Sequence, residues 1–155
     1  MSRIVRYQGA IIQDDHILLL QQRHEASGRS TWLLPGGGIE AGETEEECVQ
    51  REMLEETCLS VEVLGVLLDE PAGPGAVYQR HKTFLCKAIA GEARPGYEPE
   101  AEYSAAYTFT NLGWLDLRSP STWPEDVASH SWTYPLLQRL RAVLGYSVAP
   151  TADGA

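Results

Sequence analysis

The sequence predicts a single domain of the mixed α/β class, and three observations lead to this. The chain has 155 residues, of which 43% are hydrophobic and 22% charged, as in one globular domain. Segments with strand composition flank segments of helical periodicity. No internal repeat, low-complexity linker or change in composition divides the chain. We therefore expect one domain over residues 1–145 and a disordered tail over 146–155.

Four segments have the composition of strands, because β-branched, aromatic and other apolar residues dominate them and turn residues bound them. They are residues 4–13, 16–22, 61–69 and 76–90. A brief apolar segment over 32–34 leads into Pro35-Gly36-Gly37-Gly38, through which we expect no regular element to continue.

Two further segments, 44–57 and 133–144, predict helices. At the start of the first, Thr44 and Glu47 fit the capping box, in which each side chain bonds the other residue's backbone N–H. In the second, leucines and a valine recur at helical spacing, and Gly145 can end the helix. We assign this apolar stripe to the core.

Charge and cysteine usage exclude several classes of function. A net charge of −10 argues against a broad nucleic-acid surface, so we expect no extended nucleic acid as a partner. Cys48, Cys58 and Cys86 form no metal-ligand spacing and are odd in number, as in reduced cytoplasmic proteins. The start of the chain lacks the features of a signal peptide, and the longest apolar run, 17–20, is too short for a membrane span. We expect a cytoplasmic monomer or homodimer.

The segment 40–56 concentrates eight of the glutamates, and three of them share one face of the expected helix. Glu52, Glu55 and Glu56 stand at i, i+3 and i+4, where like charges repel, and the last two also oppose the helix dipole. Hard oxygen ligands of this kind suit Mg²⁺ or Mn²⁺. Arg51 lies four residues before Glu55 and can orient it. An exposed helix with ordinary Glu–Arg pairs is the alternative.

Joined to the glycine segment, this helix resembles a known signature. The chain reads Gly37-x5-Glu43-x7-Arg51-Glu52-Met53-x-Glu55-Glu56-x-Cys58-Leu59. It is similar to the Nudix box, GX5EX7REUXEEXGU, where U is bulky and apolar. Every charged position matches, and Cys58 stands where the family has glycine.

The resemblance implies a Nudix-type α/β/α sandwich with a mixed β-sheet, and it implies a metal site for Mg²⁺ or Mn²⁺. The resemblance also implies that Glu52 is the first choice for the general base and that Arg51 is one of the catalytic residues. Family members also recruit a carboxylate from a later loop, for which we choose Glu100 over Glu98 and Glu102. The implied metal ligands are Glu52, Glu55, Glu56, the backbone carbonyl of Gly37, Glu40 directly or through water, and Glu100.

The implied reaction is hydrolysis of a phosphoanhydride bond in a nucleoside diphosphate linked to another moiety. A nucleoside triphosphate and a nucleotide sugar both remain open as substrates. Arg23 lies where MutT-like members hold a phosphate-binding arginine, and Arg29 is a weaker candidate; both also fit exposed surface cations. Trp32 can stack on a base or belong to the core. The alternative function is an inert Nudix-like domain for ligand sensing or protein contact.

Overall fold

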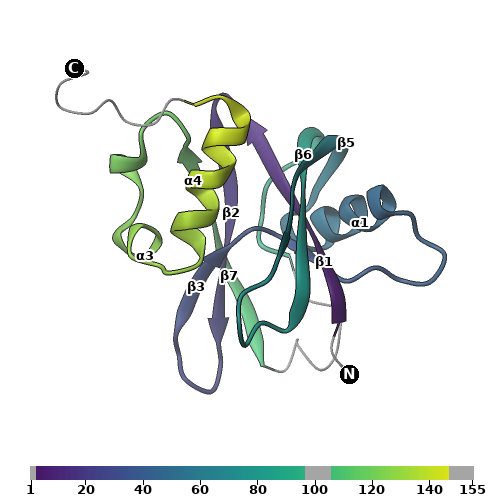
Figure 1. The fold of residues 1–155 in the computed structure, drawn as a ribbon, viewed down its shortest axis with the longest axis horizontal. Helices are drawn as coiled ribbons and strands as arrows, with labels where there is room; N and C mark the ends of the chain where they lie inside the picture. Colours follow the sequence, from purple (N-terminus) through teal and green to yellow (C-terminus); the bar gives the residue numbers. More distant parts are fainter. Residues whose placement is uncertain (1–2, 97–105, 147–155) are drawn as a thin grey trace.

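The computed structural model describes residues 3–96 and 106–146 (Figure 1). Groups of strands flank the helix α1 along this part of the chain, and the other helical elements follow the last strand. In order they are β1 (Arg3–Gln13), β2 (His16–His24), β3 (Ser30–Leu33), β4 (Gly36–Gly37), α1 (Glu45–Thr57), β5 (Leu59–Pro71), β6 (Tyr78–Gly91), β7 (Tyr107–Asp116), the 3-10 turn η1 (Pro120–Thr122), α3 (Glu125–Ala128) and α4 (Thr133–Leu144).

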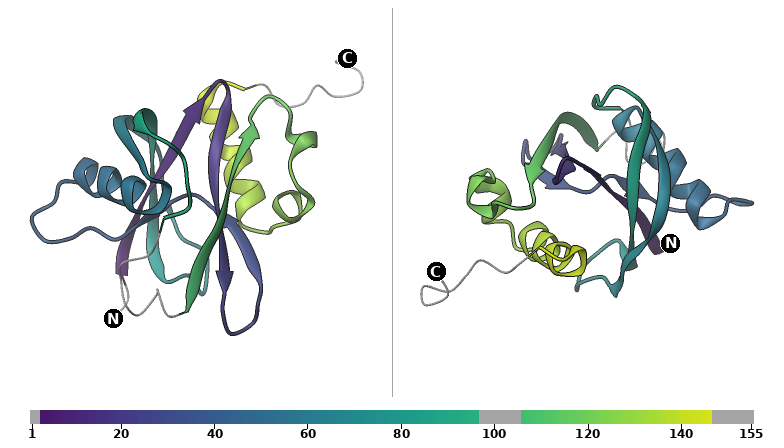
Figure 2. Two further views of the ribbon diagram at one scale, coloured as in Figure 1. Left: turned by 180° about the vertical axis from the view of Figure 1, so that it is seen from behind. Right: turned by 90° about the horizontal axis from the view of Figure 1, so that it is seen from above.

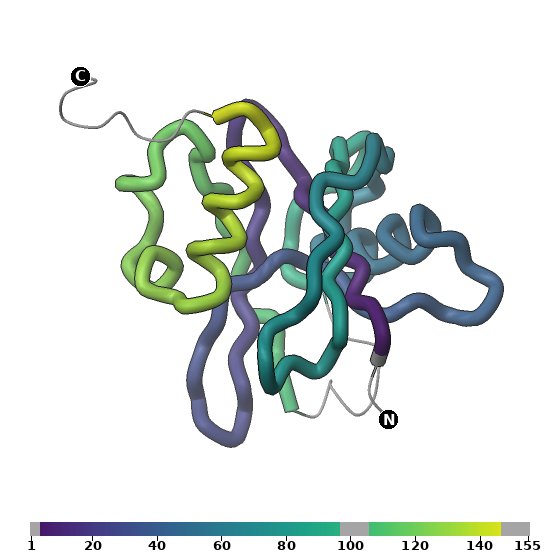
Figure 3. Tube along the Cα trace, viewed as in Figure 1, coloured from purple at the N-terminus to yellow at the C-terminus, as the bar shows by residue number. Residues whose placement is uncertain are grey.

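The strands form a mixed sheet in the order β3-β2-β1-β6-β5, with β4 paired to β1 and β7 paired to β2. β1 is the central strand: it runs parallel to β6 and antiparallel to β2 and β4. The long β5–β6 hairpin, teal in Figure 3, is antiparallel and carries several register shifts.

The sheet lies between α1 on one side and α3 with α4 on the other, which confirms the predicted α/β/α sandwich (Figures 1 and 2). Each side has its own hydrophobic cluster, and β1 contributes to both because successive side chains of a strand point to opposite faces. Tyr7 and Ile11 pack beneath α1, whereas Ala10 packs beneath α4. β1 therefore supplies alternate residues to two different environments.

The predicted capping box at the start of α1 is present. The Thr44 hydroxyl accepts a hydrogen bond from the Glu47 N–H at 3.1 Å, and the Glu47 carboxylate accepts one from the Thr44 N–H at 2.9 Å. A cap of this kind stabilises a helix by about 1 kcal/mol. The capping box fixes where α1 begins and thus the rotation of its glutamate face.

α1 ends at Cys58, which has φ 63° and ψ 17° and donates its backbone N–H to the Leu54 carbonyl. This is the left-handed region, which suits glycine and costs roughly 1 kcal/mol for a residue with a Cβ. The structure therefore explains why a glycine belongs at this position and shows that Cys58 adopts the same conformation without being one.

We expect Cys58→Gly to raise the free energy of unfolding by up to about 1 kcal/mol, because it relieves the left-handed strain. A denaturant titration should show a higher midpoint with an unchanged slope. Cys58→Ala is the matched control, since it removes the thiol but keeps the Cβ and should bring no such gain. A lower midpoint for Cys58→Gly would show that packing of the thiol outweighs the strain.

Several elements differ from the expectation. Gly36 and Gly37 continue as the short strand β4, because glycines can approach the backbone of β1 closely. β7 covers residues that the sequence analysis assigned to no strand, and its Asn111 lies opposite Gln21 where the β2–β7 register shifts. Because of its polar residues and this irregularity, β7 lacks the clear alternation of apolar and polar residues that predicts a strand from sequence.

The C-terminal helix α4 spans the predicted residues, and Gly145 ends it with φ 89°. Tyr146 continues the ordered chain by packing against the core and donating its hydroxyl to Asp15. Residues 147–155 lie outside the described part, so the disordered tail stays a prediction. In the ranges described above, no helix is both long enough and apolar enough to cross a membrane.

Candidate active site

The two glycines of β4 bring the backbone against α1. A Cβ built on Gly37 would lie 2.3 Å from Glu52 Oε1, and one built on Gly36 would lie 2.4 Å from the carbonyl oxygen of Tyr7. At Gly36 the obstacle is backbone, whereas at Gly37 it is the carboxylate of Glu52. The missing side chains thus leave a cradle in which the Glu52 carboxylate rests on the β4 backbone.

Glu56 faces the same edge of β4, one helical turn after Glu52. Its Oε1 accepts the N–H of Gly36 at 3.0 Å, and Glu52 and Glu56 are each only 1% exposed. Two buried carboxylates at neighbouring positions are costly to the fold unless bonded groups or cations compensate them. The alternative of an ordinary exposed helix face therefore does not describe these two residues.

Arg51 is the cation that the structure provides at this face. Its Nη1 lies 3.0 Å from Glu52 and 3.2 Å from Glu55, and its Nε lies 2.6 Å from Glu43. Nη2 also donates to the carbonyl of Gly38 at 3.1 Å. The Arg51 guanidinium thus connects α1 to the glycine segment and holds the carboxylates of Glu43, Glu52 and Glu55 together.

This arrangement shifts pKa values in opposite directions. The hydrogen bonds from Arg51 hold the pKa of Glu43 below its usual value. Burial raises the pKa of Glu55, and the nearby charge of Arg51 only partly opposes that effect. Glu40, 64% exposed, lies 3.6 Å from Arg51 at the edge of the network.

The residues fit a hard divalent cation by their chemistry, since such ions prefer carboxylate oxygens and no Cβ separates the Glu52 carboxylate from the β4 backbone at Gly37. In the described part of the chain, no group of three or more His, Cys, Asp or Glu side chains is arranged to ligate a metal ion. Arg51 instead binds Glu52 and Glu55. Glu100 lies outside the described residues, so its predicted role is open.

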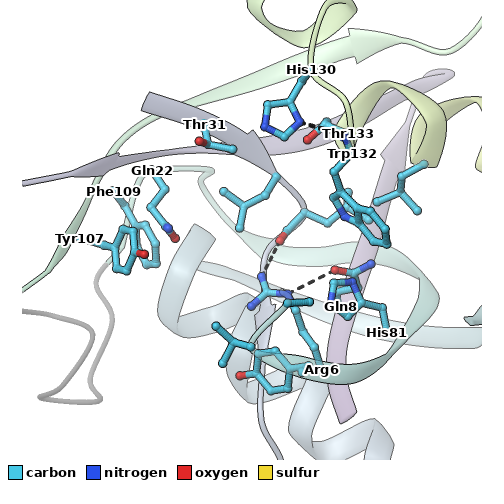
Figure 4. A pocket seen from close by; sticks show the side chains of 16 residues that line it. Arg6, Gln8, Gln22, Thr31, His81, Tyr107, Phe109, His130, Trp132 and Thr133 are labelled. Atoms are coloured by element: carbon cyan, nitrogen blue, oxygen red, sulfur yellow. Dashed lines mark hydrogen bonds between the residues drawn. The ribbon is translucent and has the colours of Figure 1, made fainter. Parts of the chain in front are cut away.

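A cavity of about 270 Å³ opens on the opposite face of β1 from α1 (Figure 4). Gln8 lines it and pairs in register with Gly36, whose N–H binds Glu56. Leu34 also lines it and stands three residues before Gly37, a span of at most about 10 Å. The cavity and the buried carboxylates are therefore neighbours across one strand.

Comparison with known proteins decides the family. The model of the NUDIX domain matches residues 4–132, most of the chain. The chain belongs to the NUDIX domain family. The recognition of the family from its box is confirmed.

Two curated NUDIX relatives and one solved structure show the range of the likeness. The chain is 40% identical over 103 residues to "Putative nudix hydrolase 1" of Caenorhabditis elegans, covering 66% of this chain and 26% of that protein. It is 38% identical over 104 residues to an ADP-ribose pyrophosphatase of Methanocaldococcus jannaschii, covering 64% and 60%. Less than two thirds of either relative is thus spanned. A MutT NUDIX hydrolase from Burkholderia pseudomallei matches with a TM-score of 0.62 and 27% identity, over 90% of this chain and 98% of that one.

The three substrate-binding candidates of the NUDIX interpretation lie in different places. Arg29 lines a second hollow that shares Gln22, Thr31 and Tyr107 with the main cavity. Arg23 is exposed, forms an ion pair with Glu25 and lines neither of these two cavities. Trp32 is 8% exposed in the core beneath α4 and donates its indole N–H to Asp126. The structure thus brings Arg29 near the cavity but not Trp32.

Sequence reasoning missed most residues of the cavity in this NUDIX domain. Arg6 and Gln8 had a usable signal, because they share a face of β1 with Ala10. The other polar and aromatic lining residues come from separate elements, and no local pattern links them. They include Gln22, Thr31, His81, Tyr107, Phe109, His130, Trp132 and Thr133 (Figure 4).

His81 lies in the cavity wall with its ring edge-on to Trp132 at 5.2 Å. Burial, helped by the charge of Arg6, lowers the pKa of His81 from 6.5 to about 4. The folded state therefore favours the neutral ring. Its contribution to stability is complete above pH 6.5 and is lost as the pH falls toward 4.

We expect the free energy of unfolding to fall more steeply between pH 6.5 and 4 in wild type than in His81→Gln. Denaturant titrations of both proteins across this pH window measure the difference. Carboxylates titrate in both proteins, so only the difference between the two slopes reports on His81. Equal slopes would show that His81 is solvated enough to protonate without cost.

Proposed function

We propose that this chain is a divalent-metal-dependent hydrolase that cleaves a phosphoanhydride bond in a nucleoside diphosphate linked to another moiety. The observation that carries the proposal is the pair of buried carboxylates, Glu52 and Glu56, packed on the β4 glycines. They lie within a few residues of a cavity large enough for a ring system. The name of the M. jannaschii relative, an ADP-ribose pyrophosphatase, supports this reaction class.

Glu52, Glu55, Glu56 and the carbonyl of Gly37 are the groups that would hold Mg²⁺ or Mn²⁺. When bound, such an ion neutralises phosphoryl oxygens and lowers the pKa of a water molecule. Glu52 is our choice for the general base, and it takes up the proton of the attacking water. Arg51 positions Glu52 and Glu55 from one side. The Gly36 N–H positions Glu56 from the other.

The substrate that we propose is a small nucleotide rather than an extended nucleic acid, because the chain carries a net charge of −10. Attack within the diphosphate releases a nucleoside monophosphate and the phosphorylated remainder. Arg29 is the candidate for a phosphate or ribose contact, since it lines the second hollow together with Thr31, which also lines the main cavity. A nucleoside triphosphate and a nucleotide sugar are both compatible with this site.

A substrate screen tests the proposal. Deoxynucleoside triphosphates, ADP-ribose, other nucleotide sugars and dinucleoside polyphosphates are incubated with Mg²⁺ or Mn²⁺, and the products are separated by anion-exchange chromatography. We expect a nucleoside monophosphate from at least one class and none after chelation of the metal. Binding of nucleotides without turnover would instead support the inert, ligand-sensing alternative.

A further inference from the structure

Arg6 stands out in the cavity because it is a cation without an acidic partner there. Its Nη2 donates to the Leu34 carbonyl at 2.9 Å and its Nε donates to Gln8 Oε1 at 3.3 Å. Among the described residues, no carboxylate forms an ion pair with it, and none belongs to the cavity lining. In a chain of net charge −10, such a guanidinium is available to a ligand.

Hydrogen bonds to neighbouring protein groups fix the orientation of the Arg6 guanidinium. Gln8 donates its amide N–H to the Thr83 hydroxyl at 2.9 Å in a buried bond, which turns its oxygen toward Arg6. A guanidinium has five N–H donors in one plane, and the two bonds to Gln8 and Leu34 leave three, including both on Nη1. The remaining donors form a fork held in place before any ligand arrives (Figure 4).

Apart from Arg6, the described residues that line the cavity include no Arg, Lys, Asp or Glu. His81 is uncharged near neutral pH, since its pKa is about 4. His130 Nδ1 accepts the backbone N–H groups of Trp132 and Thr133, so this nitrogen is already engaged within the protein. Arg6 is therefore the single permanently charged side chain that the described residues contribute to this wall.

The size and remaining walls of the cavity suit a flat ring. Its volume of about 270 Å³ is just below the range of roughly 300–1,000 Å³ typical of drug-sized ligands, which points to one base rather than a whole dinucleotide. Phe109 and Trp132 line opposite sides of it in Figure 4, and Tyr78 lies under Arg6 at 6.0 Å. Aromatic side chains of this kind stack on bases.

We propose that Arg6 makes this cavity selective for a 6-oxopurine base over adenine. The O6 and N7 atoms of a 6-oxopurine are adjacent acceptors and match two N–H donors of a guanidinium fork. Adenine presents a donor at position 6, which would oppose those of Arg6. This specificity role rests on the proposed function, because it takes the cavity as the base site of the substrate.

Equilibrium binding of monophosphates tests the role of Arg6 without any turnover. GMP, IMP, AMP and ribose 5-phosphate are titrated into the protein by calorimetry in the presence of a chelator. We expect GMP and IMP to bind at least about tenfold more tightly than AMP, within the discrimination that one bidentate arginine contact provides. Arg6→Ala should bring GMP and IMP to the level of AMP. Arg6→Lys should do the same, since it keeps the charge and loses the fork.

Arg80→Ala is the matched control, because Arg80 lies on β6 and forms its ion pair with Asp69 on the exposed surface. It should keep the preference for GMP. Equal binding of AMP and GMP by wild type, or no measurable binding of any nucleotide, overturns the proposal. A uniform loss for AMP and ribose 5-phosphate in Arg6→Ala also overturns it and assigns Arg6 to phosphate binding. A selective protein that hydrolyses nothing refutes the proposed function alone.

Discussion

Replacing Glu56 with glutamine is expected to leave the fold intact and to lower kcat by at least about 100-fold. The amide oxygen of glutamine can still accept the Gly36 N–H that Glu56 accepts now, so the local geometry is kept. What is lost is a negative charge among the proposed metal ligands. Changes to groups that merely orient such ligands already cost 10–100-fold. Steady-state kinetics and a Mn²⁺ titration by calorimetry measure the two losses.

Glu62→Gln is the control for this experiment, because Glu62 is exposed on β5 and its change removes the same charge elsewhere. It should keep wild-type kcat and Mn²⁺ affinity. If Glu56→Gln turned over substrate like wild type, the assignment of Glu56 to the metal site would be wrong.

Replacing Arg51 with methionine is expected to cause the largest loss of stability, about 2–4 kcal/mol. The Glu52 side chain is 2% exposed, and Arg51 itself is 21% exposed, so the variant leaves a buried carboxylate without its cation. Methionine retains much of the apolar stem, which limits the loss from packing. A denaturant titration in the presence of a chelator measures the change.

The same variant separates the two sources of positive charge at the site. Without Arg51, the carboxylates of Glu52 and Glu55 lose their shared partner, so added Mg²⁺ should raise the melting temperature more than it does in wild type. Arg80→Met, which removes an exposed ion pair, should cost less than about 1 kcal/mol and show the wild-type response to Mg²⁺. An unchanged response in Arg51→Met would argue against a cation at these carboxylates.

The sequence predicted the part of the site that local spacing controls. One helix turn relates Glu52 to Glu56, and the capping box fixes where that helix starts, so the shared face followed from the spacing. The pairing of Arg51 with Glu55 also followed from an i, i+4 relation. The involvement of Glu43 in the same network did not, because it depends on how the loop returns to the helix.

The cavity could not be predicted in the same way. Its walls come from β1, β2, β3, β6, β7 and the start of α4, and the pairing of these elements is set by the whole fold. Trp32 illustrates the limit: its type suits both a stacking platform and a core, and only its packing beneath α4 and its bond to Asp126 place it in the core. Arg23 likewise fitted both a phosphate contact and an exposed surface cation in the sequence, and its ion pair with Glu25 at a strand end favours the second.

The alternation of β1 has a consequence for engineering. Arg6 and Gln8 belong to the cavity, while Tyr7 and Gly9 face α1. A library that varies only the first pair would change the proposed ligand preference while leaving the side of the strand that supports the proposed metal site untouched. Deleting or inserting a single residue in this stretch would exchange the two sets and disable both at once. Substitutions, rather than changes in length, are thus the route by which a new specificity can arise on this strand.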